Sequence, residues 1–578
     1  MVLELTLRPN SVRLFFLLFI STYNGVIVNL SKIKRLLDKQ NPIFIRFAMD
    51  NTYRRISDED DFGEDETERS EIKEFFHGQT ILLTGCTGFL GKCVVEKILR
   101  DCAGIKKLIL IVRSNKVSAK ERMKKYFQHE IFEKLRSYRP NFESKVCIVE
   151  GNLIEENLGV SIEDKKMLID QVTMIYHNAS NVKFATKVSD SLKCNVFGTK
   201  YMIELARECK RLVCFMYIST AYSHSYNKVI EEKCYPPPAD LKMVQDIIDA
   251  DEIAKNGIPP ATIEETCKPW ANIYTFGKSI AESLVEEFGK ETSYPCIIYR
   301  PSQIISTYQE PFPGWCGNYN GPVLLFVGYG LGIIHINAPV DFVQDYVPVD
   351  MCANSILALT WDTVTNRKQS IEKVFIYNYA SSTVNPMTMK EFEDNGVARI
   401  AGSPSIRMIG PAFMIQAPCW FLYFVFHFLL HGIPAVIADI VFMAMLRKPQ
   451  AIAMFCKITL NLKAILYWGT YDWRITVTET QKMWERMNHR DRFLFYNDLR
   501  TIDWSIFGYS IWFGIKKYLL KEPLDDPPAR RKYFLIQSAF YSFKILVIVC
   551  ILYYLLGYWL SLISPITEFV KLKYICHM

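Results

Sequence analysis

Between residues 79 and 300 the chain alternates short apolar runs with longer stretches of helical pattern. The apolar runs cover residues 80–84, 108–112, 146–149, 173–177, 213–218 and 296–299. Runs of this length are typical of buried strands, whereas helices in globular proteins are longer. Strands that alternate with helices form βαβ units, which build a parallel sheet with helices on both faces. The pattern therefore predicts an α/β fold with a Rossmann-type, doubly wound parallel sheet.

A second apolar block covers residues 412–446 and is interrupted by polar and helix-breaking residues. These are His427, His431, Gly432, Pro434 and Asp439. Two full membrane spans need roughly 40 residues plus a turn, so the block is too short for a spanning pair. Three interpretations remain open: a re-entrant hairpin, an apolar surface that faces a membrane, or a buried pair of helices.

A third block, residues 545–563, holds nineteen residues without a charge between Lys544 and Pro565. Its length and its late Tyr and Trp residues predict a membrane span, with a buried core helix as the alternative. More basic residues precede the block than follow it. They are Arg530, Arg531, Lys532 and Lys544 on one side, and Lys571 and Lys573 on the other. This bias predicts that the part of the chain before the block is cytosolic and that the C-terminus is luminal.

The N-terminal part differs from the rest of the chain. Residues 15–30 are apolar but broken by polar residues, which makes them a poor spanning helix. A signal anchor, a weak membrane-surface segment and an alternative translation start at Met49 all remain open. The acidic residues 57–68 repel one another and predict a disordered linker.

These patterns divide the chain into four expected parts. The first, residues 1–75, is an N-terminal extension with the acidic linker. Residues 76–395 form the cofactor-binding Rossmann domain, residues 396–530 a helical C-terminal domain, and residues 531–578 a membrane anchor with a short tail.

Composition excludes some functional classes. The net charge is +7, but the basic residues are dispersed, so nucleic-acid binding is not expected. The sixteen cysteines form no C-x-x-C pair and show no zinc-ligand spacing, which favours reduced thiols and no metal site. An aromatic fraction of 13% and a hydrophobic fraction of 50% favour association with a lipid membrane.

Residues 83–92 read LTGCTGFLGK and place three glycines directly after the first predicted strand. Glycines there let backbone N–H groups approach a pyrophosphate, and the following helix directs its positive dipole end at the same anion. The motif alone does not exclude an ordinary glycine-rich turn. The residues expected to contact a dinucleotide are Thr84, Gly85, Thr87, Gly88, Phe89, Leu90 and Gly91.

Arg113 ends the second apolar run, about twenty residues beyond the glycines, where an NAD enzyme carries an acidic residue on the ribose. Arg113, with Lys116 nearby, offers positive charge to a 2′-phosphate instead. The cofactor predicted from this position is NADPH. A loop arginine that only faces water is the alternative.

The segment YTFGK places Tyr274 and Lys278 four residues apart, on one face of a helix. A phenol with a pKa near 10 becomes an effective acid when a neighbouring ammonium lowers its pKa. The strand VCFMYI leads into Ser219 and Thr220, and a hydroxyl there can bond a substrate carbonyl oxygen. A surface Tyr/Lys pair is the alternative for YTFGK alone, but with the glycine motif and the strand-end hydroxyl it predicts an oxidoreductase.

The chain resembles the extended short-chain dehydrogenase/reductases, and more closely the alcohol-forming fatty acyl-CoA reductases. The resemblance runs from about Phe75 to Glu522 and rests on FFHGQTILLTGCTGFLGKCVVEKILR, NVFGTK, YISTAY, YTFGKSIAE, YRPSQI, EPFPGWCGNYNGP, DYVPVD and DRFLFYNDLRTIDWSIFGYSIWFGIKKYLLKE. Epimerases and steroid dehydrogenases of the superfamily share the glycines and the Tyr/Lys pair but lack the last stretch.

The resemblance implies a role for each residue of the site. Tyr274 would be the proton donor, Lys278 its activator and a ribose ligand, and Thr220 the carbonyl anchor, with Ser219 as the alternative. Asn195 in NVFGTK would either complete a proton relay or bond the backbone of its own helix.

Two departures from the family's pattern bear on the cofactor. Gly151-Asn152 replaces a Gly-Asp pair whose carboxylate lies near the adenine, so the contact from Asn152 is in doubt. His177-Asn178-Ala179-Ser180 replaces a more apolar run. Asn178 and Ser180 would either meet the cofactor or only narrow the pocket.

The implied activity is reduction of a long-chain acyl-CoA to a fatty alcohol with two NADPH, through an aldehyde and with release of CoA. The expected location is a membrane, first the endoplasmic reticulum with the reductase part cytosolic, with the peroxisome or a lipid droplet also open. The alternatives are a membrane-bound sterol dehydrogenase or sugar-nucleotide epimerase, and a non-catalytic NADPH-binding protein of lipid surfaces. Chain-length preference, release of aldehyde and protein partners are not indicated.

Overall fold

A computed structural model describes residues 68–114, 117–182, 187–319, 321–337, 342–367, 373–468 and 471–575. These residues belong to one compact unit, Thr67–Met578. The predicted N-terminal extension and acidic linker, apart from their last residues, lie outside the described residues, as does Lys116. The domain boundaries expected after residues 395 and 530 stay predictions.

Seven strands form one parallel sheet, in the order β12-β7-β5-β4-β1-β2-β3. They are β1 (Thr80–Thr84), β2 (Lys107–Val112), β3 (Val146–Glu150), β4 (Met174–His177), β5 (Cys214–Ile218), β7 (Cys296–Pro301) and β12 (Val374–Tyr379). The six predicted apolar runs are therefore strands of the sheet. The edge strand β12 was not predicted.

The chain order reverses at β1, which pairs with β2 on one side and with β4 on the other. In a doubly wound sheet, ligands bind beyond the carboxyl ends of the strands at this switch point. Every residue of β1 is buried, as expected for a central parallel strand covered on both faces. The topology thus places the glycine-rich segment after Thr84 where a ligand crevice is expected.

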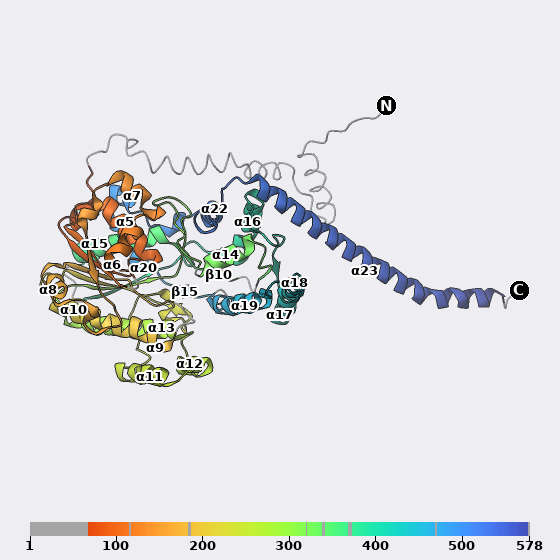
Figure 1. The fold of residues 1–578 in the computed structure, drawn as a ribbon, viewed down its shortest axis with the longest axis horizontal. Helices are drawn as coiled ribbons and strands as arrows, with labels where there is room; N and C mark the ends of the chain where they lie inside the picture. Colours follow the sequence, from red (N-terminus) through yellow and green to blue (C-terminus); the bar gives the residue numbers. More distant parts are fainter. Residues whose placement is uncertain are drawn as a thin grey trace, which may run out of the picture. The chain divides into compact units, whose positions relative to one another are not determined.

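Helices cover both faces of the sheet (Figure 1). One face carries α4 (Glu71–Phe76), α5 (Phe89–Asp101), α6 (Ala119–Phe127), α7 (Glu133–Tyr138), α15 (Val349–Asn366) and α20 (Thr478–Arg486). The other carries α8 (Ile162–Gln171), α9 (Val188–Leu192), α10 (Gly198–Glu208) and α13 (Ile273–Glu291), with α11 (Leu241–Ile253) and α12 (Pro260–Thr266) beyond them. Separate apolar cores fill the two faces.

The C-terminal part is mainly helical, and the short strands β14 and β15 pair it with segments that lie earlier in the chain. Its helices are α16 (Met389–Gly402), α17 (Trp420–His427), α18 (Ile433–Ala444), α19 (Ala451–Trp468), α21 (His489–Leu494) and α22 (Trp504–Gly514), with α14 (Pro322–Gly330) from the preceding segment. The short pairs are β10 (Val343–Gln344) with β13 (Met387–Thr388), β11 (Tyr346–Pro348) with β8 (Gln303–Ile305), β14 (Ile415–Gln416) with β9 (Ile336–Asn337), and β15 (Arg474–Ile475) with β6 (Val229–Ile230).

Two apolar segments are long enough to cross a membrane. The first, Trp420–Ala444, is mostly exposed, so the interpretation of residues 412–446 as a buried helical pair is wrong. The second lies in α23 (Pro527–Ile575), which contains the candidate span Pro527–Leu560, and every residue from 545 to 560 is exposed. The predicted span at residues 545–563 is therefore not a core helix. These two segments support association of the chain with a membrane.

Candidate active site

The segment between β1 and α5 is a tight turn built from glycine. Gly85 has φ +70°, and a Cβ there would come within 2.7 Å of the backbone nitrogen of Ala179. A Cβ on Gly91 would overlap the carbonyl oxygen of Gly85. Both positions are therefore restricted to glycine by the approach of backbone to backbone. Thr87 and Gly88, at the crest of the turn, are exposed.

The N-terminal end of α5, which follows this turn, has the features of an anion-binding site. Gly88 is the N-cap of the helix and supplies no side-chain cap, and the first turn carries no acidic residue. Unsatisfied N–H groups and the helix dipole make such an end a binding site for phosphate. Leu90 is buried beneath the turn, while the Phe89 ring stacks on Trp315 with centroids 5.2 Å apart. Phe89 is thus oriented by the Pro313-Gly314-Trp315 loop.

Arg113 and Asn152 follow the next two strands of the sheet. Arg113 comes directly after β2 and its side chain is exposed. Asn152 lies two residues beyond β3, where its Nδ2 donates to Glu155 Oε1 at 2.7 Å. Its Oδ1 is buried and has no hydrogen-bond partner among the described residues. An acceptor oriented this way suits an amino group such as that of adenine.

The segment after β4 makes internal contacts. Thr84 Oγ1 lies 2.9 Å from His177 Nδ1, and Asn178 Nδ2 donates to the carbonyl oxygen of Gly85 at 3.3 Å. Burial, with a smaller contribution from Lys278, lowers the pKa of His177 to about 3, so its ring is neutral. The Thr84 and Asn178 side chains therefore tie the glycine turn to β4.

Asn195 lies in a π-helical turn, η4 (Lys193–Phe197), and is 2% exposed. Its Oδ1 accepts the backbone N–H of Asn181 at 2.7 Å and the hydroxyl of Ser180 at 2.9 Å. Its Nδ2 donates to the carbonyl oxygen of Asn181 at 3.1 Å. The amide thus bonds the segment after β4, and its Nδ2 also donates to Ser191 Oγ of the preceding helix α9 at 3.4 Å. A role in a proton relay stays a prediction.

Tyr274 and Lys278 lie on α13, whose first turn is capped by the Asn272 side chain. Lys278 is buried, donates from Nζ to the carbonyl oxygen of Ile218 at 2.6 Å and lies over the Tyr217 ring. Burial lowers the pKa of Lys278 to about 8. Burial also raises the pKa of the half-buried Tyr274, so the expected lowering by the ammonium is not present. A phenol with a raised pKa stays protonated, which is the form that donates a proton.

Thr220 follows the end of β5 and begins the turn η5 (Ala221–His224). Its Oγ1 accepts the backbone N–H of Tyr222 at 3.3 Å, a bond that uses a lone pair and not the hydroxyl hydrogen. The adjacent Ser219 donates instead to Glu282 Oε1. Ser219 is therefore engaged away from the site, which favours Thr220 as the hydroxyl that meets a substrate.

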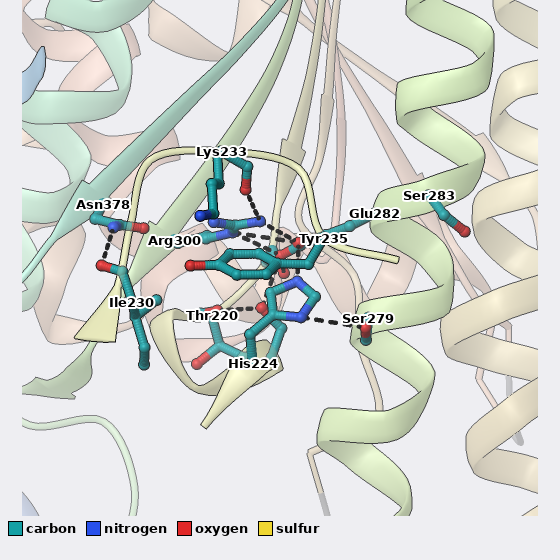
Figure 2. Close-up of polar contacts among 12 residues, drawn as sticks. Thr220, His224, Ile230, Lys233, Tyr235, Ser279, Glu282, Ser283, Arg300 and Asn378 are labelled. Carbon is teal, nitrogen blue, oxygen red and sulfur yellow. Dashed lines mark hydrogen bonds and ion pairs between the residues drawn. The ribbon is translucent and has the colours of Figure 1, made fainter. Parts of the chain in front are cut away.

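A buried ionic network, which we call the turn cluster, joins this turn to α13 (Figure 2). It consists of Ser219, Ser223, His224, Glu282 and Arg300. The Glu282 carboxylate accepts from Arg300 Nη2 at 2.6 Å, from His224 Nε2 at 2.8 Å and from Ser223 Oγ at 2.9 Å. Burial alone would raise the pKa of Glu282, but Arg300 and His224 hold it well below its usual range.

Arg300 completes the network and is itself fully buried. Its two terminal nitrogens donate to the carbonyl oxygens of Glu231 and Lys233, both at 3.1 Å. The Tyr235 ring lies over His224 and near the guanidinium. The strand-end turn is thus fixed to α13 and to the segment after β6.

Sequence reasoning missed the turn cluster, although one signal was present. Glu282 follows Lys278 by four residues, as Lys278 follows Tyr274, so all three share one helical face. A third polar residue on that face indicates a buried partner. The identity of that partner depends on the fold, because Arg300 and His224 come from separate segments.

The residues present fit a nicotinamide dinucleotide. The uncapped start of α5 suits a pyrophosphate, the buried Asn152 Oδ1 suits the adenine amino group, and Arg113 lies beyond β2 at the expected ribose position. Lys278, Thr220 and Tyr274 come from the end of β5 and the start of α13, on the other side of the switch point. The arrangement suits hydride transfer to a carbonyl group.

Solved structures share this fold. The terminal R domain of the myxalamid PKS-NRPS pathway aligns with a TM-score of 0.53 and 18% identity, covering 77% of this chain and 93% of that domain. The reductase (R) domain of a nonribosomal peptide synthetase from Mycobacterium tuberculosis aligns with a TM-score of 0.50 and 18% identity, covering 76% and 91%. At this identity the likeness concerns the fold alone.

Sequence comparison gives the family. Two family models described as male sterility protein match residues 83–356, an NAD-binding domain, and residues 430–522. Fatty acyl-CoA reductase 1 of Mus musculus is 31% identical over 484 residues, which cover 83% of this chain and 92% of the relative. Fatty acyl-CoA reductase wat of Drosophila melanogaster is 30% identical over 475 residues, covering 81% and 90%. The chain belongs to the fatty acyl-CoA reductase family.

Proposed function

We propose that this protein reduces a long-chain acyl-CoA to the fatty alcohol with two NADPH, through an aldehyde, and releases CoA. The observation that carries the proposal is the bond from Lys278 to the carbonyl oxygen of Ile218, which joins the helix of Tyr274 to the end of β5, two residues before Thr220. The relatives' names supply the substrate class. The nicotinamide, when bound, supplies a hydride to the carbonyl carbon in each step.

In the first step, Thr220 and Tyr274 donate hydrogen bonds to the thioester carbonyl oxygen as it gains negative charge. Donors placed where charge develops stabilise the transition state more than the substrate. When the oxyanion collapses, the C–S bond breaks and CoA leaves as its thiolate. The products of this step are the aldehyde and CoA.

In the second step, the aldehyde oxygen becomes an alkoxide and needs a proton. Tyr274 supplies it, because a phenol is protonated at neutral pH and is a much stronger acid than the alcohol that forms. Lys278, which the carbonyl oxygen of Ile218 holds at the end of β5, supplies positive charge beside the resulting phenolate and a donor for the ribose. The CoA thiolate is stable without a proton, whereas the alkoxide formed from the aldehyde must be protonated to give the alcohol. The second step therefore depends more on Tyr274 than the first.

The choice of NADPH rests on Arg113. Its exposed guanidinium follows β2 at the ribose position, where a 2′-phosphate would accept two parallel hydrogen bonds. An acidic residue at this position would instead favour NADH.

The test of the proposal is a product assay on the full chain in detergent. Acyl-CoAs of several chain lengths are incubated with NADPH or with NADH, and products are identified by mass. We expect fatty alcohol and free CoA, with NADPH preferred. Failure of every acyl-CoA, with turnover of a sterol or a nucleotide sugar, would overturn the proposal in favour of another activity of the superfamily.

A pair of tyrosine variants tests the mechanism. Tyr274→Phe should bind NADPH but slow turnover by roughly 10²–10⁴-fold, the contribution of a positioned acid, and slow aldehyde reduction more than thioester reduction. Tyr294→Phe is the control, because its hydroxyl only donates to the carbonyl oxygen of Ala206. Aldehyde reduction by Tyr274→Phe at the unmodified rate would exclude Tyr274 as the acid.

A further inference from the structure

The helices α17, η6 (Phe428–Gly432) and α18 run on continuously, and α19 returns after a turn at residues 445–450. We call residues 420–468 the hairpin. Its inner side is closed by polar contacts. The buried Asp439 carboxylate accepts the backbone N–H groups of Gln450, Ala451 and Ile452 at 2.8–3.0 Å, which caps α19. His427 Nε2 lies 3.0 Å from Thr459 Oγ1 across the two helices.

The outer side of the hairpin is apolar and exposed. Phe421 is 74% exposed, Phe424 64%, Phe428 56%, Ile437 55% and Ile440 56%. Contiguous apolar surface of this extent is rare on a soluble protein and marks a contact with a partner or a membrane. The capped inner side removes the need for water at the turn, so the hairpin can enter an apolar environment without losing backbone hydrogen bonds.

A stack of rings joins the hairpin to α23 at the point where α23 becomes uncharged. The Phe540 and Phe413 centroids are 4.8 Å apart, Phe413 and His335 are 4.5 Å apart, and His335 and His431 are 5.4 Å apart. Phe540 precedes the start of the uncharged run, residues 545–563, by five residues. The first arm of the hairpin, at His431, is therefore connected through these rings to α23 near the start of its uncharged run.

Charge at the turn matches a lipid headgroup region. Arg447 and Lys448 are both exposed between α18 and α19. Basic residues near a membrane are attracted by anionic lipids, whereas at the bilayer centre they are costly. The whole segment Trp420–Ala444 is long enough to cross a membrane, but from His431, which the ring stack holds beside α23, the helix continues only to Ala444. This part reaches about 20 Å, less than the roughly 30 Å of the hydrocarbon core. This geometry favours a hairpin that lies along the membrane over one that crosses it.

We propose that the hairpin is a membrane-docking face, which lies in the interface of the bilayer that α23 enters. Phe424 and Ile437 contact the acyl chains, and Arg447 and Lys448 lie among the headgroups. The inference does not rest on the chemistry proposed above, because it depends only on the exposed face, the ring stack and the charges.

Spin labels in liposomes test this with the full chain. The variant I437C carries the label on the outer face, K448C carries it at the turn, and M243C is the control on α11, since Met243 is an exposed apolar residue of the reductase fold. The background replaces Cys419, Cys456, Cys550 and Cys576 by serine, and a circular dichroism spectrum and a cooperative thermal unfolding transition that match those of the unmodified chain show that it folds. Collisions with oxygen report lipid, and collisions with a water-soluble nickel chelate report water.

We expect the label at position 437 to meet oxygen far more than nickel, the label at 448 to lie at headgroup depth, and the label at 243 to behave as in water. Water-like access at 437 would overturn the proposal. Strong dipolar broadening between labels at 437, with no lipid access, would show that a second copy covers the face and would also overturn it. A label at 448 beyond the far headgroups would show a crossing hairpin and exclude the interfacial position.

The role of charge is tested separately. R447E with K448E should make the label at 437 shallower in vesicles that contain phosphatidylserine, and should change its depth less in pure phosphatidylcholine. An equal change in both kinds of vesicle would exclude attraction to anionic lipid as the orienting force. The acyl-CoA assay is not needed for either result, so failure here is distinct from failure of the proposed function.

Discussion

The turn cluster and the end of α5 bury similar charged groups on opposite faces of the same sheet. At the end of α5, Lys97, Arg100, Glu96, Asp101 and Glu310 form a second network, which we call the α5 cluster. The turn cluster has one carboxylate, Glu282, which accepts hydrogen bonds from four side chains. The α5 cluster has three carboxylates for two cations. In the turn cluster, all the negative charge lies on Glu282. In the α5 cluster, the negative charge is divided among three carboxylates, so the loss of one leaves two to pair with the cations.

The two clusters also differ in what they hold. Glu282 fixes the turn that carries Thr220 to the helix that carries Tyr274 and Lys278. Lys97 instead donates to Glu310 and to the carbonyl oxygen of Leu494, which ties α5 to the C-terminal part. We therefore expect the turn cluster to affect catalysis and stability together, and the α5 cluster to affect stability alone.

Of the variants considered, Glu282→Gln should have the largest effect on the free energy of unfolding and on kcat. Removing one partner of a buried ion pair costs about 3–5 kcal/mol, because Arg300 is left buried without its counter-charge. A displacement of the turn by about 1 Å would slow turnover by up to about 100-fold. Denaturant unfolding in detergent and kcat measure the two effects. If the variant is destabilised but its kcat is unchanged, the turn cluster contributes to stability and not to catalysis.

Glu310→Gln is the matched variant in the α5 cluster. Lys97 and Arg100 keep Asp101 at 2.7 and 2.8 Å, so we expect a loss of about 1–3 kcal/mol, the range of one charged hydrogen bond. The segment that carries Glu310 should stay in place in this variant, because the Asp350 carboxylate accepts the backbone N–H groups of residues 308–310. A fall in kcat as large as that of Glu282→Gln would show that both clusters support the site.

The stabilisation by Glu282 should be lost in acid, which can be measured by comparing the pH dependence of unfolding in the unmodified chain and in Glu282→Gln. The folded pKa of Glu282 lies below its value in the unfolded chain, so its contribution is present above about pH 4.5 and is lost as pH falls. The gap in unfolding free energy between the unmodified chain and Glu282→Gln should be constant above about pH 5.5. It should then shrink by up to about 1.4 kcal/mol per pH unit. A gap that persists to pH 3 would contradict the assigned charge state.

Arg113 belongs to neither cluster, so Arg113→Asp should change cofactor affinity with little effect on stability. The side chain is exposed, so unfolding free energy should change by less than about 0.5 kcal/mol. NADPH affinity should fall more than about tenfold, since a charge-assisted pair is lost and repulsion is added, while NADH is affected less. Equal shifts in the two Michaelis constants would show that Arg113 does not contact the 2′-phosphate.

Local pattern predicted most of the sheet, because central parallel strands are buried on both faces and read as continuous apolar runs. The six predicted runs are β1 to β5 and β7. The strand β12 has the same character, with the sequence VFIYNY, and its pairing with β7 appears only in the fold. Local sequence does not specify an edge strand that returns after α15.

The site residues were predictable where one motif contains the chemistry, as in the glycine turn and in YTFGK. The bonds that orient them were not, because they join distant segments. Asn195 holds Asn181 from a π-helical turn, and Glu282 meets Ser219 and Arg300 from opposite directions along the chain. The exposed hairpin was also left open by the sequence, since apolar composition alone does not separate a buried pair from a surface.

The helix α23 starts at Pro527, only seven residues after η8 (Ile515–Leu520) ends, and contacts the fold through Lys532, Gln537 and Phe540. A helix that contacts the fold in this way differs from a flexible tether, and we expect these contacts to limit how far the proposed catalytic groups can lie from the lipid. A substrate that partitions into the bilayer would then arrive by lateral diffusion. Its turnover should follow the mole fraction of acyl-CoA in the membrane, and dilution with inert lipid should slow the enzyme at constant bulk concentration.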